Sequence, residues 1–276
     1  MKPLKYNPEI ILSFTSVDRF IFRVSDIEEL ENIPDELKYR LAVCHIYLIC
    51  KRPRLTLIPK SIKVTDDRIF FIVEYRLFGV VHIKEVSLSK KHFFDEEVRF
   101  EVSTYPHREI LTYDDSENHI STTLIANYVH LFDGIPDEVK NLEVLYVGKG
   151  LKDSAKDRLE KHSTLQKILA DINSNEPDYE VFALVYSFER PKKNLMAFTD
   201  TKPENAREKF EEFIRKAKSY NPTVNEQIAI IEATLISYFV TTKYNSHYVD
   251  FPNKEVKILD EIYEVDFAAV TVLIDN

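Results

Sequence analysis

The chain has 276 residues, of which 44% are hydrophobic and 30% charged, and its formal net charge is −9. The first 14 residues hold an apolar run of only three residues, too short for a secretory signal, and no later run approaches a membrane span. We therefore expect a soluble, cytoplasmic protein without a membrane partner, long enough to bury two cores.

A helix is predicted first, in the N-terminal half. Pro34-Asp35-Glu36 suits a helix start, and apolar residues follow at helical spacing: Leu37, Leu41, Cys44 and Leu48. The two cysteines, Cys44 and Cys50, are expected in this one apolar helix. They lack the companion Cys or His pairs of a zinc site, so both are interpreted as core thiols.

Strands are predicted for much of the remaining N-terminal half. Arg68 to Leu77 and Val80 to Leu88 are rich in β-branched and aromatic residues, with Gly79 between them as a hairpin turn. The polar stretch Thr112 to Thr123 is the clearest candidate linker. We expect an α+β domain with a β-meander over 1–118, followed by a second domain over 119–276.

The C-terminal half predicts an α/β (α+β) arrangement in which a small, mostly antiparallel sheet is flanked by helices. Strands are expected at Leu124 to Phe132, Glu143 to Gly148, Tyr179 to Phe188 and within Ile258 to Ile274. Helices are expected at Ser154 to Ile172, Glu204 to Ser219 and Asn225 to Phe239, with a polar insertion at Glu189 to Lys202.

Arg158 and His162 are four residues apart in a predicted helix, so both are expected on one face. A guanidinium can meet two oxygens of a phosphate at once, which makes the pair a candidate phosphate clamp. Two polar residues on a solvated helix face are the alternative.

Glu232 lies within an apolar helical stripe. Its helix is expected to begin with Thr223 and Glu226 in capping-box spacing, and the neighbours of Glu232 three and four positions away are apolar. A buried carboxylate needs a cation, a metal ion or a raised pKa. Glu232 is therefore a metal ligand, half of a structural ion pair, or a residue at the edge of the apolar stripe.

These residues occur in an order that resembles the GIY-YIG nuclease superfamily, over roughly residues 124 to 250. Tyr128 stands in a first motif that reads Ala126-Asn127-Tyr128, and Tyr146-Val147-Gly148 matches the second motif. Arg158 follows Tyr146 by 12 residues, His162 follows by 4 more, and Asn245 lies 13 beyond Glu232, which resemble the family's spacings.

The resemblance implies an endonuclease that hydrolyses phosphodiester bonds in DNA, with RNA not excluded, in a restriction, defence or repair context. Glu232 would hold Mg²⁺ or Mn²⁺, Tyr128 would take a proton from the attacking water, and Arg158 would stabilise the pentacovalent phosphate. Tyr146 and His162 would orient groups or relay protons. Asn245 is included as the family's asparagine, and Lys149 would add a phosphate contact.

Substrate binding is the difficulty for an acidic chain. Residues 1–120 hold 18 basic and 20 acidic residues, and residues 121–276 hold 19 and 26. Cations must therefore be concentrated locally. The best candidate patch is a run of five cations without an acid: Lys51, Arg52, Arg54, Lys60 and Lys63. It is either a DNA-binding surface or a solvated loop and strand.

Two alternatives remain open. The chain could be a catalytically inactive module that keeps the fold to bind nucleic acid or protein. The N-terminal half could also be a specificity, sensor or interaction domain that holds the nuclease inactive, with a homo-oligomer or a regulatory protein as partner.

Overall fold

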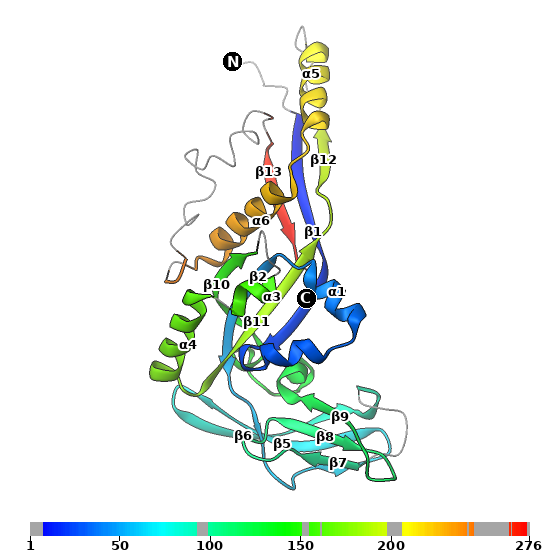
Figure 1. Cartoon of the computed structure of the whole chain (residues 1–276), viewed down its shortest axis with the longest axis vertical. Coiled ribbons are helices and arrows are strands. Elements are labelled where there is room, and N and C mark those ends of the chain that lie inside the picture. The colour runs from blue at the N-terminus through cyan, green and yellow to red at the C-terminus, as the bar shows by residue number, and fades with distance from the viewer. Residues whose placement is uncertain are drawn as a thin grey trace. The chain divides into compact units, whose positions relative to one another are not determined.

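The computed structural model describes residues 8–92, 99–150, 155–160, 162–197, 206–241, 243–245, 265 and 267–274. The fold is mixed α+β with mostly antiparallel sheets. It divides into two compact units (Figure 1). Unit 1 comprises Met1–Cys50, Val144–Ile168 and Phe182–Asn276, and unit 2 comprises Lys51–Glu143 and Leu169–Val181.

The compact units do not follow the expected division at residues 118 and 119. Those residues lie where a turn enters the second strand of a hairpin, β8 (Glu109–Tyr113) and β9 (His119–Leu124), inside unit 2. The linker expected at 112–123 is therefore wrong. Apart from the buried Thr112, its polar residues are exposed or half-buried on the β8–β9 hairpin, whose strands hydrogen-bond their backbones without needing an apolar face there.

A six-stranded sheet is built largely from unit 1, in the order β10-β2-β11-β1-β12, with β13 also pairing with β1. Its strands are β1 (Pro8–Arg23), β2 (Ile46–Pro53), β10 (Glu143–Lys149), β11 (Tyr179–Phe188), β12 (Lys192–Ala197) and β13 (Ala269–Leu273). The long strand β1 is antiparallel to β11 and β12 and parallel to β13. The first 50 residues thus supply strands to the same sheet as the C-terminal half.

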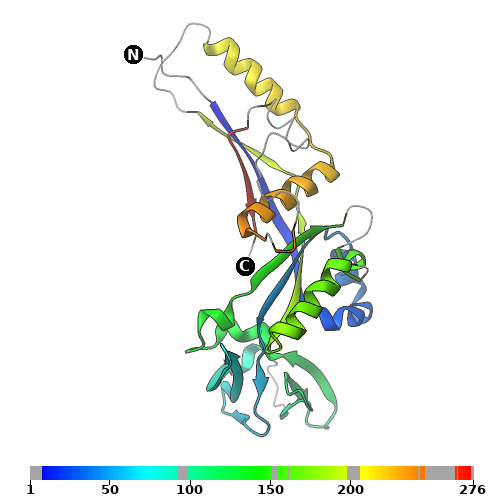
Figure 2. The same ribbon diagram turned by 90° about the vertical axis from the view of Figure 1, so that its left-hand side faces the viewer.

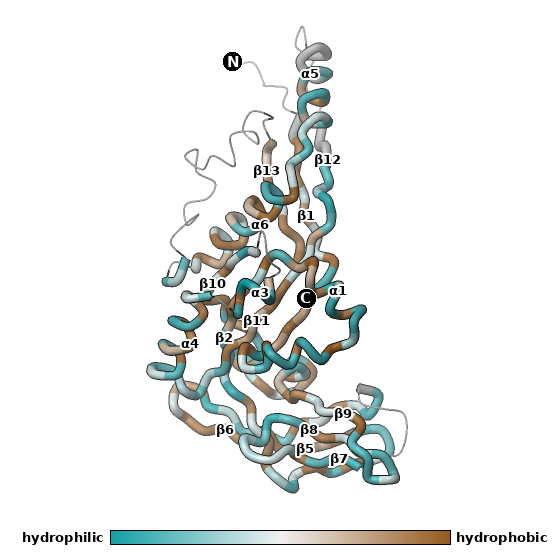
Figure 3. Tube along the Cα trace, viewed as in Figure 1, coloured by the Kyte–Doolittle hydropathy of each residue, from teal (hydrophilic) through white to brown (hydrophobic). Residues whose placement is uncertain are grey.

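The helices of unit 1 are of unequal hydropathy. They are η1 (Val24–Asn32), α1 (Asp35–Ala42), α3 (Ala155–Glu160), α5 (Ala206–Ser219) and α6 (Val224–Phe239), together with the first part of α4 (Ser163–Asn175). Figure 3 shows α6 as largely hydrophobic and α5 as largely hydrophilic. α6 packs beside β13, and eight of its residues are buried, Glu232 among them.

Unit 2 contains two further sheets and a core of its own. One sheet has the order β3-β5-β4 with β6 pairing with β5, and the other has the order β7-β8-β9. The remaining elements are β3 (Thr56–Leu57), β4 (Lys63–Val64), β5 (Arg68–Leu77), β6 (Val80–Ser89), η2 (Lys90–His92), β7 (Arg99–Val102), η3 (Ile125–Leu131) and α2 (Asp137–Lys140).

Several predicted elements are confirmed closely. The hairpin of β5 and β6 turns at Phe78 and Gly79, both with positive φ (51° and 78°), as a two-residue hairpin turn requires. The strands β10 and β11 and the helices α5 and α6 begin and end within two residues of the predicted bounds. The capping box is present: Thr223 Oγ1 accepts from the N–H of Glu226 at 3.3 Å.

Other predictions about secondary structure are wrong. The helix expected to continue past Cys44 ends at Ala42, and the β-branched and aromatic run from Ile46 forms β2, all of whose residues are buried. Cys50 is therefore on a strand, although both cysteines are buried as predicted. Burial raises the pKa of the Cys44 thiol to about 12, as befits an unreactive core thiol.

The segment 124–132 is η3, a 3-10 helix, and not a strand beside β10. The helix expected over 154–172 is two helices, α3 and α4, and β12 occupies part of the expected polar insertion. Of the strands expected within 258–274, β13 is present, and 258–264 lie outside the described residues. No described helix combines the length and the apolar character needed to cross a lipid bilayer.

Candidate active site

Two tyrosines lie side by side on the neighbouring strands β2 and β10 of unit 1. The ring centroids of Tyr47 and Tyr146 are 6.1 Å apart. Tyr47 is 1% exposed, whereas Tyr146 is half-buried. Burial raises the pKa of Tyr47, and neighbouring Tyr146 and Glu232 raise it further, whereas Arg158 lowers it. The phenol pair is thus protonated at neutral pH unless further cations approach.

Gly148 makes this close approach sterically feasible. A Cβ atom at residue 148 would lie 2.5 Å from the hydroxyl oxygen of Tyr47 and 2.7 Å from Cε1 of Tyr146. Real Cβ atoms do not tolerate such contacts, and both rings are held by their strands. The glycine of the Tyr146-Val147-Gly148 motif therefore allows one tyrosine ring to lie over the backbone that carries the other.

His162 completes an aromatic cluster with these tyrosines. Its ring centroid is 5.8 Å from that of Tyr47 and 5.1 Å from that of Tyr146. Its Nδ1 accepts the N–H of Leu165 at 3.2 Å, so in the neutral ring the proton is on Nε2. Nε2 lies 3.4 Å from the Tyr146 hydroxyl oxygen and donates to it.

The charge state of His162 follows from its surroundings. The side chain is 5% exposed, and burial lowers its pKa, with Arg158 lowering it further. A neutral imidazole that donates to a phenol oxygen favours the ionised phenolate over the neutral phenol. His162 is therefore placed to assist ionisation of Tyr146.

Arg158 lies on α3, and His162 lies between α3 and α4, so the expectation that both project from one continuous helix is wrong. The N–H of His162 bonds to the carbonyl of Leu159 at 3.2 Å, which continues the turn locally. Arg158 is exposed, yet its charge lowers the pKa values of Tyr47, Tyr146 and His162. Arg158, through its charge, and His162, through its ring, therefore both act on the two tyrosines.

Glu232 and Lys149 form an ion pair at 2.7 Å, with side chains 10% and 21% exposed. The buried carboxylate in the apolar helix α6 thus has the counter-charge that its position requires. The carboxylate of Glu232 also raises the pKa of Tyr146, after burial, which is the larger cause. Glu232 is therefore part of the tyrosine cluster.

The donor set limits how a metal ion could be held. Among the described residues no group of three or more His, Cys, Asp or Glu side chains could enclose an ion. Glu232 offers one carboxylate, and Mg²⁺ commonly binds one or two carboxylates together with substrate phosphates. The residues present fit such an ion in the company of a phosphate, with Lys149 displaced from the carboxylate.

Asn245 acts on the backbone of β10. Its Oδ1 accepts the N–H of Val147 at 3.1 Å, and its Nδ2 donates to the carbonyl oxygen of Val147 at 2.8 Å. The hydroxyl of Thr241 donates to the same Oδ1 at 2.6 Å. β10 is the last strand in the sheet order, and this side chain pairs with its outer edge as another strand would. Asn245 therefore positions the strand that carries Tyr146 and Gly148.

Tyr128 is placed in unit 2, on η3, where it packs against the hydrophobic core of that unit. Sequence reasoning missed Tyr47, which is the tyrosine beside Tyr146. The available signal was the tripeptide His45-Ile46-Tyr47 at the start of a buried strand. The apolar residues over 37–48 recur at helical spacing and so predict a helix where this strand begins.

Three of the five cations expected to form a DNA-binding patch are used inside unit 2. The ammonium of Lys51 lies 2.5 Å from Glu176 and 3.4 Å from Glu143. Arg52 is 4% exposed, and burial lowers its pKa to about 10 while Glu180 acts in the opposite direction. Arg54 is half-buried.

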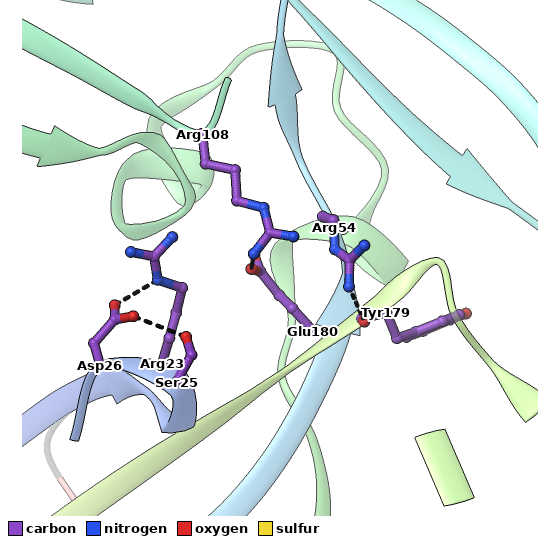
Figure 4. Close-up of polar contacts among 7 residues, drawn as sticks. All are labelled: Arg23, Ser25, Asp26, Arg54, Arg108, Tyr179 and Glu180. Carbon is purple, nitrogen blue, oxygen red and sulfur yellow. Dashed lines mark hydrogen bonds and ion pairs between the residues drawn. The ribbon is translucent and has the colours of Figure 1, made fainter. Parts of the chain in front are cut away.

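Figure 4 shows how the arginines meet β11: Arg54 donates to the carbonyl oxygen of Tyr179 at 3.2 Å, and Arg108 lies 3.4 Å from Glu180. Cations buried on a strand need such partners. Lys60 and Lys63 are exposed, and Lys63 is 3.4 Å from Glu85. The expected five-cation surface is therefore not formed.

Comparisons with protein-family models, with curated proteins and with solved structures give no match for this chain.

Proposed function

We propose that unit 1 is a metal-dependent endonuclease that hydrolyses phosphodiester bonds in DNA by chemistry of the GIY-YIG type. The observation that carries the proposal is the convergence of Tyr47, Tyr146, His162 and Glu232, which come from four separate parts of the chain. Such buried titratable groups with mutually shifted pKa values are typical of catalytic sites.

The sequence motifs support the same proposal when Tyr47, and not Tyr128, is assigned as the tyrosine of the first motif. His45-Ile46-Tyr47 keeps the last two residues of Gly-Ile-Tyr, and the two motif strands, β2 and β10, are neighbours. In this interpretation residues 51–143 are inserted between the two motifs. That insertion explains why the two tyrosines are 99 positions apart.

In the proposed reaction Tyr47 and Tyr146 would orient the attacking water and accept its proton. Both phenols have raised pKa values, so ionisation needs nearby positive charge and the N–H that His162 donates to Tyr146. Arg158 would stabilise the charge on the phosphate. A Mg²⁺ or Mn²⁺ ion held by Glu232 supplies Lewis-acid stabilisation of the phosphate and of the leaving 3′-oxygen when bound.

The experiment is an assay of the full chain on supercoiled plasmid with Mg²⁺ or with EDTA. We expect nicking or linearisation with Mg²⁺ alone, and its loss in Glu232→Gln and Tyr146→Phe. Cleavage that persists in EDTA, or in both variants, would contradict the proposal.

A second candidate function is a non-catalytic nucleic-acid-binding module with the same fold. The ion pair between Lys149 and Glu232 favours it, because Lys149 already neutralises the carboxylate that a metal ion would need. DNA binding without cleavage under any divalent ion would support this second function.

A further inference from the structure

The end of α5 and the start of β12 carry exposed cations in unit 1. They are Lys192, Arg215, Lys216 and Lys218, named here the α5 cation surface. Lys193 joins the two segments: its ammonium donates to the carbonyl oxygen of Lys218 at 3.2 Å and to that of Tyr220. The start of β12 and the end of α5 are therefore adjacent.

One face of α5 lines an open hollow of about 550 Å³. Its lining residues are spaced three, four and seven apart, with one more at the helix end: Glu211, Ile214, Arg215, Lys218 and Ser219. In the part of the chain that the structure describes, neither Arg215 nor Lys218 forms an ion pair. Their charges are therefore available to an anion.

The other two cations have exposed carboxylate partners. Lys192 is 2.6 Å from Glu189, and Lys216 is 3.3 Å from Glu212. Exposed pairs of this kind are weak, so they can exchange readily for a phosphate.

The net charge of the region around this surface is opposite in sign to that of the whole chain. Residues 189–220 hold nine basic and six acidic residues, a net charge of 9 − 6 = +3, whereas the whole chain has −9. The last seven residues of α5, Phe213–Ser219, contain three basic residues and no acidic one. Such a local concentration is what an acidic protein needs to meet a polyanion.

The position of the surface suits the proposed active site. Only residues 220–223 separate α5 from α6, and Figure 2 shows the two helices following one another in unit 1. Glu232 is eight residues beyond Val224, about 12 Å along α6.

We propose that the α5 cation surface binds the phosphate backbone of duplex DNA, independently of sequence, and delivers it to the cluster around Tyr146. The inference rests on the proposed nuclease function and adds the place where the substrate is held. The α5 cation surface takes the place of the DNA-binding patch expected over residues 51–63, most of whose cations contact groups within unit 2.

The test measures binding of a 30-base-pair duplex to the full chain in EDTA, over a series of salt concentrations. The variant is Arg215→Ala/Lys216→Ala/Lys218→Ala. The matched control removes three exposed lysines elsewhere, Lys84→Ala/Lys91→Ala/Lys167→Ala, with the same change in net charge. Each lost phosphate contact lowers the slope of log K against log salt by about 0.9.

We expect the α5 variant to bind more weakly and to lose roughly two to three units of salt slope, whereas the control keeps a slope close to wild type. Equal slopes for the two variants would overturn the inference while leaving plasmid cleavage, and so the proposed function, intact. A wild-type protein that neither binds nor cuts DNA would overturn both. Binding to vesicles of anionic lipid, with no binding to the duplex, would assign the surface to a lipid headgroup and overturn the inference.

Discussion

Two clusters of buried or half-buried polar side chains, one in each unit, are built differently. In unit 2, the buried Lys51 and the half-buried Arg108 meet the carboxylates of Glu176 and Glu180, so charge is matched by charge. In unit 1, two phenols and an imidazole converge with a single ion pair beside them. Matched charges fix a structure, whereas titratable groups with shifted pKa values can do chemistry.

The largest contrast is expected between two glutamates. Glu180→Gln removes the carboxylate that acts on the guanidinium of Arg52, which is only 4% exposed, and should cost about 3 kcal/mol of folding free energy. Glu232→Gln should cost less than about 1 kcal/mol, because Lys149 is 21% exposed and can turn to water. Urea denaturation of both variants checks this. Equal losses would show that the two carboxylates have the same structural role.

A smaller effect is expected for the residue that holds β10. Asn245→Asp replaces the donor to the Val147 carbonyl by an acceptor and should cost about 2 kcal/mol. Thr241→Val removes one hydrogen bond to Asn245 and should cost about 1 kcal/mol. Thermal unfolding of the two variants measures the difference. If Asn245→Asp is as stable as wild type, the side chain does not position β10.

The smallest effect is on pH dependence. The pKa of His162 in the folded protein lies below the ordinary value of about 6.5 for histidine, so the unfolded chain binds this proton more readily. The stabilisation is complete above about pH 6.5 and is lost as pH falls through the folded pKa. His162→Asn should therefore flatten the loss of stability between about pH 7 and 5. A variant that loses stability on acidification as steeply as wild type would contradict the buried, neutral imidazole.

Local signals in the sequence predicted part of this architecture. The hairpin at Gly79, the capping box at Thr223 and the strand β11 were predicted because each is specified by residues close together in the chain. The motifs in the sequence also singled out Tyr146, His162 and Glu232 as candidate site residues, and in the structure they lie in one cluster. Lys149 was expected to contact phosphate, and its pairing with Glu232 could not be derived from spacing.

The features that the sequence did not reveal depend on contacts between residues that are far apart in the chain. In the sequence, β2 is difficult to distinguish from a continuation of α1. Both of its faces are buried, and a strand buried on both faces lacks the alternation of polar and apolar residues that predicts a strand. The inserted residues 51–143 then hid Tyr47 from its partner 99 positions later. Lys51 and Arg52 resembled a surface patch because their carboxylates come from residues more than 90 positions away.

The most direct test of the central claim compares two tyrosines, Tyr47 and Tyr128, as partners of Tyr146. Each is changed to Phe in the full chain, and single-turnover cleavage of a DNA duplex is measured with Mg²⁺. Loss of a proton-transfer group typically costs 10²–10⁴-fold in rate. We expect a loss of about 100-fold or more for Tyr47→Phe and a rate within about threefold of wild type for Tyr128→Phe. The reverse result, with Tyr128 required and Tyr47 dispensable, would contradict it.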